Sequence, residues 1–136
     1  DNNVSYRYSG LSHRALGWPP ELKQMRDRLH RDWGLRFNAV LCNAYRDGQD
    51  RMGWHSDNEA ELGDDPTLAS ISLGAARRFS WREIQTSGFG PSRPMQLPGG
   101  SLLWMGRGLQ TKWQHGLPQQ KSCRQLRVNL TFRLIR

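Results

Sequence analysis

The pattern of hydrophobic and polar positions predicts one early helix followed by many short strands. Between residues 20 and 33, apolar residues recur three or four positions apart, which indicates one apolar face of a helix. Pro19-Pro20 would begin this helix and Gly34 would end it. The apolar face comprises Leu22, Met25, Leu29 and Trp33. We expect the helix to pack on a sheet, with its basic face toward solvent.

The rest of the chain has the period of strands. A short strand is expected at residues 6–9 and a loop at 11–18. Later strands are expected at residues 37–45, 68–73, 78–84, 95–97, 101–105 and 127–135. Loops are expected at residues 86–91, 106–108 and 116–121. One helix followed by many short strands favours a mainly β (α+β) fold of the jelly-roll barrel type.

Length and composition narrow the class of protein. The 136 residues suffice for one domain with its own core. No apolar stretch approaches the roughly 20 residues that cross a bilayer, so we expect no membrane partner. We also expect the protein to be a monomer. The two cysteines form no disulfide framework, and Cys42, beside the apolar run at 39–41, is expected to be buried. With this cysteine usage we expect a cytoplasmic location.

The charge is unevenly distributed along the chain. Residues 1–65 carry nine Lys/Arg and eleven Asp/Glu, whereas residues 66–136 carry eleven Lys/Arg and one acid, Glu83. The net charges of −2 and +10 add to the total of +8. Such a basic half suits a polyanion, with nucleic acid as the first candidate partner. A basic soluble protein without such a partner would have the same charge.

Three residues have the chemistry of an open metal site. His55 and Asp57 are two positions apart, so on an extended strand both would project from one face. His115 supplies the third ligand, since His13 and His30 are expected at the surface. Two histidines and one carboxylate form the facial triad that leaves coordination positions open on Fe(II). Those positions are what a 2-oxo acid and dioxygen require.

The final strand carries the second signal. Arg127, Asn129, Thr131 and Arg133 fall on one face and apolar residues on the other. On the outside of the domain the polar face would simply be solvated. Inside the barrel, two guanidiniums would instead bind a dicarboxylate through charge-assisted hydrogen bonds. An amide and a phenol for the same ligand would come from Asn43 and Tyr45 on another strand.

Taken together, these motifs resemble the AlkB-type Fe(II)/2-oxoglutarate dioxygenases, which repair alkylated nucleic acids. The resemblance extends from Tyr6 to the last residue, and the run from Arg127 to Arg133 is its most diagnostic part. The other matching pieces are Asn43-Ala44-Tyr45, His55-Ser56-Asp57, Gly100-Ser101-Leu102-Leu103 and His115. The family carries a nucleotide-recognition segment ahead of its first matching strand. Almost none of that segment precedes Tyr6, so we expect residues 1–136 to form a single dioxygenase domain without it.

The resemblance implies a fold and a set of ligands. The fold would be a double-stranded β-helix with helices packed on one sheet. Fe(II) would be held by His55, Asp57 and His115, with 2-oxoglutarate and O2 as co-substrates. The residues implied to hold 2-oxoglutarate are Asn43, Tyr45, Arg127, Asn129, Thr131 and Arg133. Arg127 would bind the distal carboxylate, and Arg133 would lie nearer the metal-bound end.

The resemblance also implies oxidative demethylation of N-alkylated bases in DNA or RNA, with release of formaldehyde, succinate and CO2. The target base must leave the stack to reach the metal. It would lie between Tyr8 and His55, with Tyr6 and Glu59 at its edge. Ordinary strand packing remains an equal interpretation of the two tyrosines. Candidate phosphate contacts are Arg77, Arg78, Arg82 and Arg93.

Other interpretations stay open at this stage. The same dioxygenase chemistry acting on a protein, lipid or small molecule is one, because loops set the substrate. A non-enzymatic basic β-barrel that binds nucleic acid is another, but it leaves the pattern from Arg127 to Arg133 unexplained. A zinc hydrolase built on the same three ligands would have no use for those arginines.

Overall fold

The computed structural model describes residues 5–8, 11–14 and 16–136, and the side chains from residue 16 onward. The strands are β1 (Ser5–Tyr8), β2 (Leu11–Arg14), β3 (Ala39–Tyr45), β4 (Met52–His55), β5 (Leu68–Gly74), β6 (Arg77–Gln85), β7 (Gly88–Phe89), β8 (Arg93–Leu97), β9 (Leu102–Met105), β10 (Trp113–Leu117) and β11 (Arg127–Arg133). The helical elements are α1 (Pro20–Trp33), η1 (Ala60–Leu62) and α2 (Leu109–Lys112). None of the helices in the described ranges has the length and apolar character needed to span a bilayer.

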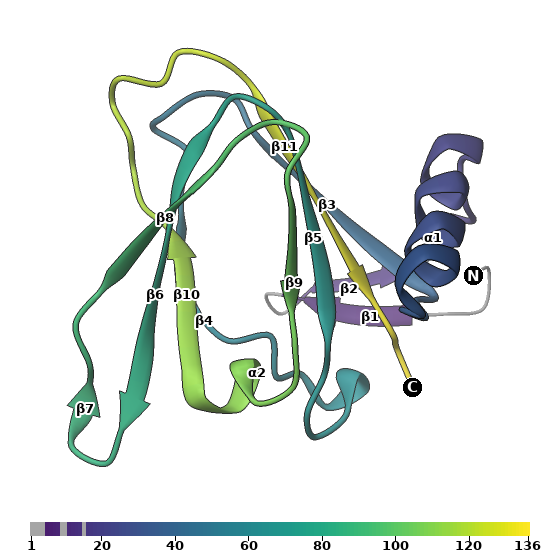
Figure 1. Ribbon diagram of the computed structural model, residues 1–136, viewed down its shortest axis with the longest axis horizontal. Helices are drawn as coiled ribbons and strands as arrows, with labels where there is room; N and C mark the ends of the chain where they lie inside the picture. Colours follow the sequence, from purple (N-terminus) through teal and green to yellow (C-terminus); the bar gives the residue numbers. More distant parts are fainter. Residues whose placement is uncertain (1–4, 9–10, 15) are drawn as a thin grey trace.

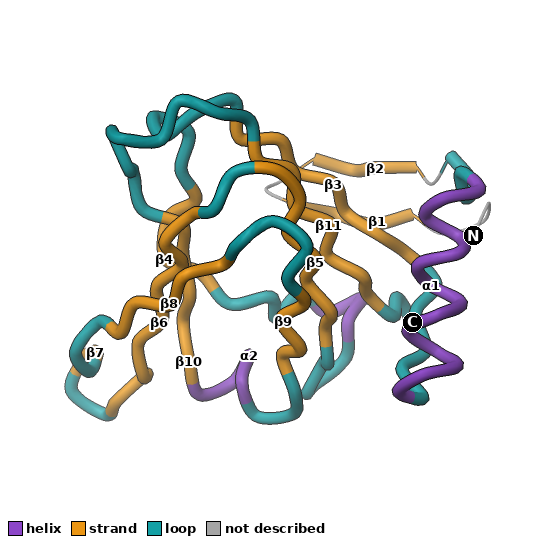
Figure 2. Tube along the Cα trace, turned by 45° about the horizontal axis from the view of Figure 1, so that its top comes forward, coloured by secondary structure: helices purple, strands orange, loops and turns teal. Residues whose placement is uncertain are grey.

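Two antiparallel sheets form the body of the domain (Figure 1). The four-stranded sheet has the order β3-β11-β5-β9. The five-stranded sheet has the order β4-β10-β6-β7, with β8 also paired to β6. β1 and β2 form a separate hairpin. Figure 2 shows the two sheets approaching each other, with α1 on the outer side of the four-stranded sheet. This arrangement agrees with the predicted jelly roll and its supporting helix.

Strand β11 separates two environments. Its residues alternate, so Leu130 and Phe132 face α1 while the arginines face the other sheet. Leu29 of α1 packs with Leu130 and Phe132 in the main buried cluster. Burying a leucine or phenylalanine side chain stabilises a fold by about 1.5–3 kcal/mol. This packing fixes one face of β11 and leaves the opposite face free to build a site.

The helix follows its prediction except at one end. It begins at Pro20 and ends at Gly34, whose φ of +69° is left-handed and whose N–H donates to the carbonyl of His30. Trp33, predicted on the apolar face, is 60% exposed instead. Trp18 stacks on Phe132 with ring centroids 6.2 Å apart. The tryptophan against the sheet therefore comes from the segment before the helix.

Other predictions were also wrong in detail, among them the loop expected at residues 86–91, where Gly88–Phe89 form β7. Residues 11–14, expected as loop, form strand β2. Residues 116–117 belong to strand β10 and not to a loop. Cys42 is exposed. It lies on β3, an edge strand, so nothing pairs with that strand on its outer side among the described elements.

Candidate metal and co-substrate site

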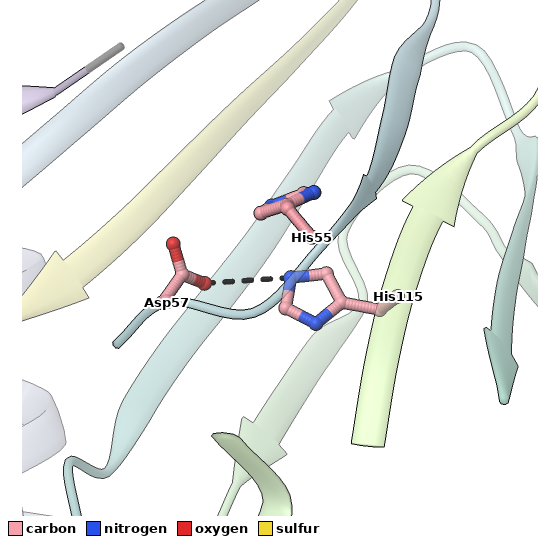
Figure 3. A group of neighbouring side chains, drawn as sticks. All are labelled: His55, Asp57 and His115. Atoms are coloured by element: carbon pink, nitrogen blue, oxygen red, sulfur yellow. Dashed lines mark ion pairs between the residues drawn. The ribbon is translucent and has the colours of Figure 1, made fainter. Parts of the chain in front are cut away.

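The three predicted metal ligands meet between the two sheets. His55 ends β4 and pairs directly with His115 of β10, while Asp57 follows two residues beyond β4 (Figure 3). Asp57 therefore does not lie on the strand, as predicted, but in the irregular segment that follows it. The ligand atoms of the three residues lie within 4.8 Å of one another. The two imidazole centroids are 4.3 Å apart.

The donor set fits a divalent metal. Metal–nitrogen and metal–oxygen bonds of about 2.0–2.2 Å place two ligand atoms at right angles roughly 3 Å apart. Asp57 Oδ2 and His115 Nε2 lie 3.4 Å apart. Two imidazoles and one carboxylate are also the facial triad that suits Fe(II). Small adjustments of these side chains would accommodate the ion.

Hydrogen bonds with neighbouring groups orient two of the three ligands, His55 and Asp57. His55 Nδ1 lies 2.8 Å from the carbonyl oxygen of Gly53, so a proton on Nδ1 leaves Nε2 for a metal. The Asp57 backbone N–H donates to Gln110 Oε1 at 2.9 Å. Arg133 Nη2 donates to Asp57 Oδ1 at 2.7 Å. Asp57 is thus held through both its backbone and its carboxylate.

The same contacts set the charge of the ligands. Burial alone would raise the pKa of Asp57, but the contact with His115 and the charge of Arg133 outweigh it and lower that pKa to about 2. Burial, followed by the charge of His115, lowers the pKa of His55 below its usual value. At neutral pH the site therefore presents a carboxylate and an imidazole that retains a free lone pair, as metal binding requires.

The polar face of β11 lines the same cavity. Arg127 and Arg133 are 2% and 3% exposed. The cavity reaches from the metal ligands to Arg127, and part of it is open to solvent. The residues of the predicted co-substrate set that line it are Asn43, Tyr45, Arg127, Asn129, Thr131 and Arg133. All six predicted positions are thus brought together.

Arg127 is a buried cation in need of an anion. Its Nη2 donates to Ser72 Oγ at 3.0 Å, and its guanidinium lies 5.3 Å from the ring centroid of Tyr45. Its Nε is buried without a hydrogen-bond partner, and none of the described carboxylates pairs with it. Burial lowers the pKa of this guanidinium. A carboxylate of a bound 2-oxo dicarboxylate fits this donor.

Asn129 and Thr131 have a different role in this conformation. The Asn129 amide donates to Ser70 Oγ at 2.7 Å and to the Ile71 carbonyl at 3.1 Å. Thr131 Oγ1 donates to Asn129 Oδ1 at 3.2 Å. The two side chains fix each other and tie β11 to β5. They line the cavity mainly as an ordered polar wall.

Of the predicted base-contacting side chains, the structure describes that of Glu59. Glu59 precedes η1 outside the cavity lining, and its Oε2 is buried without a hydrogen-bond partner. The side chains of Tyr6 and Tyr8 lie outside the described residues.

One of the four predicted phosphate contacts is wrong. Arg77 is 0% exposed, and its guanidinium donates to the carbonyls of Asp47, Asp50 and Pro118. It therefore clamps the loop before β4 to the loop after β10. The other three predicted positions, Arg78, Arg82 and Arg93, remain at or near the surface.

Sequence reasoning missed two kinds of residue at this site. Gln110 is 1% exposed on the short helix α2, and no periodic signal marks so short a helix. Ser70 and Ser72 alternate with apolar residues on β5, and this alternation could have indicated a polar face opposite Asn129 and Arg127.

Comparisons with known proteins agree with this geometry. The 2OG-Fe(II) oxygenase superfamily matches residues 1–133. "DNA oxidative demethylase ALKBH2" of Bos taurus is 44% identical over 140 residues, covering 99% of this chain and 50% of that protein. "Alpha-ketoglutarate-dependent dioxygenase alkB homolog 3" of Homo sapiens is 38% identical over 139 residues, covering 97% of this chain and 49% of that protein. The chain thus spans about half the length of these relatives.

A solved structure supports the fold. The structure titled "The structure of OsALKBH1" superposes with a TM-score of 0.56 at 19% identity, covering 84% of this chain and 60% of that one. The predicted jelly roll is therefore confirmed. The chain belongs to the 2OG-Fe(II) oxygenase superfamily, and its relatives identify it as an AlkB-type member.

Proposed function

We propose that this protein removes methyl groups from N-alkylated bases of DNA or RNA by oxidation with O2 and 2-oxoglutarate. The methyl carbon leaves as formaldehyde and the 2-oxo acid as succinate and CO2, so that formaldehyde takes up one oxygen atom of O2, succinate takes up the other, and CO2 is the carboxylate lost from the 2-oxo acid. The observation that carries the proposal is the meeting of His55, Asp57 and His115 with the buried cation of Arg127 in one cavity. When bound, Fe(II) supplies the oxygen activation that the side chains lack.

We propose that the chain's own residues bind and orient. Arg127 binds the distal carboxylate of 2-oxoglutarate, with Tyr45 packed against the same guanidinium. Arg133 lies at the metal end, where it holds Asp57. Asn43 faces Asn129 across β3 and β11 and closes the wall between these two ends. The low exposure of these groups excludes water from the reaction.

The substrate is proposed from two independent supports. The printed name of the Bos taurus relative describes a DNA oxidative demethylase. The net charge of +8 favours a polyanionic partner. We propose that the flipped base lies between Tyr8 and His55, with Tyr6 and Glu59 at its edge. The Glu59 Oε2 atom, buried without a donor, suits an exocyclic amine of a base.

The test is formaldehyde release from a methylated oligonucleotide with Fe(II), ascorbate and 2-oxoglutarate. We expect release that requires all three and is lost in His55→Ala. His30→Ala is the matched control, because His30 is an exposed histidine of α1. Formation of succinate without demethylation would contradict the proposed nucleic-acid substrate and favour another substrate for the same chemistry. If iron-loaded protein forms neither formaldehyde nor succinate, the proposed enzymatic activity is refuted and a nucleic-acid-binding protein without enzymatic activity is favoured.

A further inference from the structure

The outer face of the five-stranded sheet carries a groove that shares only Met52 and Gly116 with the lining of the catalytic cavity. Strand alternation turns His115 toward the cavity and Gln114, paired with Arg82, away from it. The groove is open to solvent. Its lining includes Arg51, Trp54, Arg78, Ser80, Pro94 and Gly116.

The groove has uncompensated positive charge. Arg51 and Arg78 are exposed, and neither forms an ion pair with any carboxylate among the described residues. No acidic residue lines the groove. The arginines of α1 differ, because Arg26 pairs with Asp27 and both Arg28 and Arg31 pair with Asp32. The groove is therefore a local attractor for anions.

Trp54 gives the groove a fixed aromatic wall. Its side chain is 38% exposed. The Arg82 guanidinium lies 4.5 Å from the Trp54 ring centroid and 3.8 Å from that of Phe89. Gln114 accepts two hydrogen bonds from this guanidinium. Since Arg82 does not line the groove, it supports Trp54 from one side while another part of the ring borders the groove.

A glycine keeps the floor of the groove free of a side chain. Gly116 pairs with Ser80 on the outward face, and a Cβ atom there would lie 3.1 Å from the Met52 carbonyl oxygen. Small residues at 80 and 116 leave the space between Trp54 and Arg78 open. No large side chain at positions 80 and 116 therefore blocks an approach to Trp54 from the groove.

We propose that this groove binds a single-stranded nucleic acid outside the catalytic cavity, with phosphates on Arg51 and Arg78 and one base stacked on Trp54. Aromatic stacking surfaces combined with positive charge are how proteins hold single strands without sequence preference. An acidic peptide would use the arginines but not the ring. A duplex would keep its bases stacked and out of reach.

This inference rests on the proposed function and extends it. Trp54 and His55 are neighbours on β4, which is an edge strand of its sheet. A nucleic-acid strand whose target base enters the cavity can pass around the β4 edge of the sheet. Its adjacent nucleotides can then bind the groove. Two linked contacts raise the overall affinity of the protein for the nucleic acid even though the contacts with the target base in the cavity stay the same. We therefore expect longer substrates to be favoured over short ones.

The first test is fluorescence anisotropy with an unmethylated oligonucleotide of about 12 nucleotides, a length within the usual site sizes. We expect the Arg51→Glu/Arg78→Glu variant to lose about tenfold or more in affinity. Its log–log salt slope should be shallower by about 1.4, or 0.7 for each lost contact. Arg36→Glu/Arg136→Glu is the charge-matched control, because both arginines are exposed and lie away from the groove lining.

Trp54→Leu separates stacking from charge. It should weaken binding by at least about fivefold while leaving the salt slope unchanged. The inference is overturned if the groove variants bind like the charge-matched control, or if poly-glutamate displaces the oligonucleotide as effectively as a second oligonucleotide does. Melting temperatures equal to wild type would establish that the variants are folded.

Demethylation rates on a short and a long substrate distinguish a failure of this inference from a failure of the proposed function. The groove variants should demethylate a methylated trinucleotide like wild type but a longer oligonucleotide less efficiently. If wild type demethylates neither substrate, the proposed function fails, and the anisotropy results still decide the groove. If the groove variants demethylate both lengths like wild type, the groove takes no part in substrate binding and the inference fails.

Discussion

Two arginines on one strand should respond in opposite ways to the same substitution. Arg127 and Arg133 project from the same face of β11, and each is at least 97% buried. Arg133 donates to the Asp57 carboxylate at 2.7 Å, whereas Arg127 has no carboxylate partner among the described residues. Replacement of either by methionine removes the charge and keeps much of the side-chain length.

The structure sets the size of each effect. Arg133→Met leaves the buried Asp57 carboxylate without its guanidinium, and breaking such a pair costs about 3–5 kcal/mol. Arg127→Met loses the hydrogen bond to Ser72 and the contact with Tyr45, together about 1–2 kcal/mol. It also removes a buried, unpaired cation whose desolvation costs several kcal/mol. We therefore expect the ligand-free protein to keep its stability or gain up to about 2 kcal/mol.

The measurement is urea unfolding of chelator-treated protein without 2-oxoglutarate. Arg127→Met should unfold at or above the wild-type urea concentration, and Arg133→Met well below it. With Mn(II) and 2-oxoglutarate under anaerobic conditions, wild type should gain stability by ligand linkage, and Arg127→Met should gain little. If Arg127→Met loses more than about 2 kcal/mol in the ligand-free protein, the guanidinium is a structural element and does not serve to bind a carboxylate.

Three further predictions concern the surroundings of the site. Gln110→Leu removes the buried acceptor of the Asp57 N–H, so calorimetry should find Mn(II) binding weakened by about tenfold or more; unchanged affinity would contradict this role. Burial lowers the pKa of His55, so as the pH falls below about 6.5 this histidine takes up a proton in the unfolded chain before it does so in the folded protein. The free energy of unfolding of the metal-free protein, measured in urea, should therefore fall over this pH range. His55→Gln should make that fall smaller. Arg77→Met leaves three backbone carbonyls without their donor and should cost about 3 kcal/mol or more in urea unfolding, whereas Arg78→Met should change stability by less than about 0.5 kcal/mol.

The inward face of β11 could be predicted because period-two alternation survives in a central strand. Both arginines, Asn129 and Thr131 line the cavity together, as the alternation predicts. The pairing of His55 with His115 places two of the three ligands on neighbouring strands of one sheet. On β11 the local pattern was sufficient because the sheet geometry converts a spacing of two into a common face, whereas Asp57 lies beyond the end of β4 and is not placed by that spacing.

Other features depend on contacts between distant segments and leave no local pattern. Arg77 looks like any surface arginine in the sequence, and its burial follows from two loops that converge on it. Trp33 has helical spacing, yet Trp18 occupies the sheet surface instead. Gln110 is marked only by its place on a four-residue helix. Predicting these residues requires the fold as a whole.

The position of β11 has a consequence for how the protein reaches its native state. It is the last of the described strands along the chain, yet it pairs with both β3 and β5 at the middle of its sheet. The four-stranded sheet therefore cannot close on the ribosome until residue 133 has left the exit tunnel. Until then β3 and β5 present unpaired edges, and such exposed edges invite aggregation. The segment that completes the binding cavity is thus also the one that ends this vulnerable period.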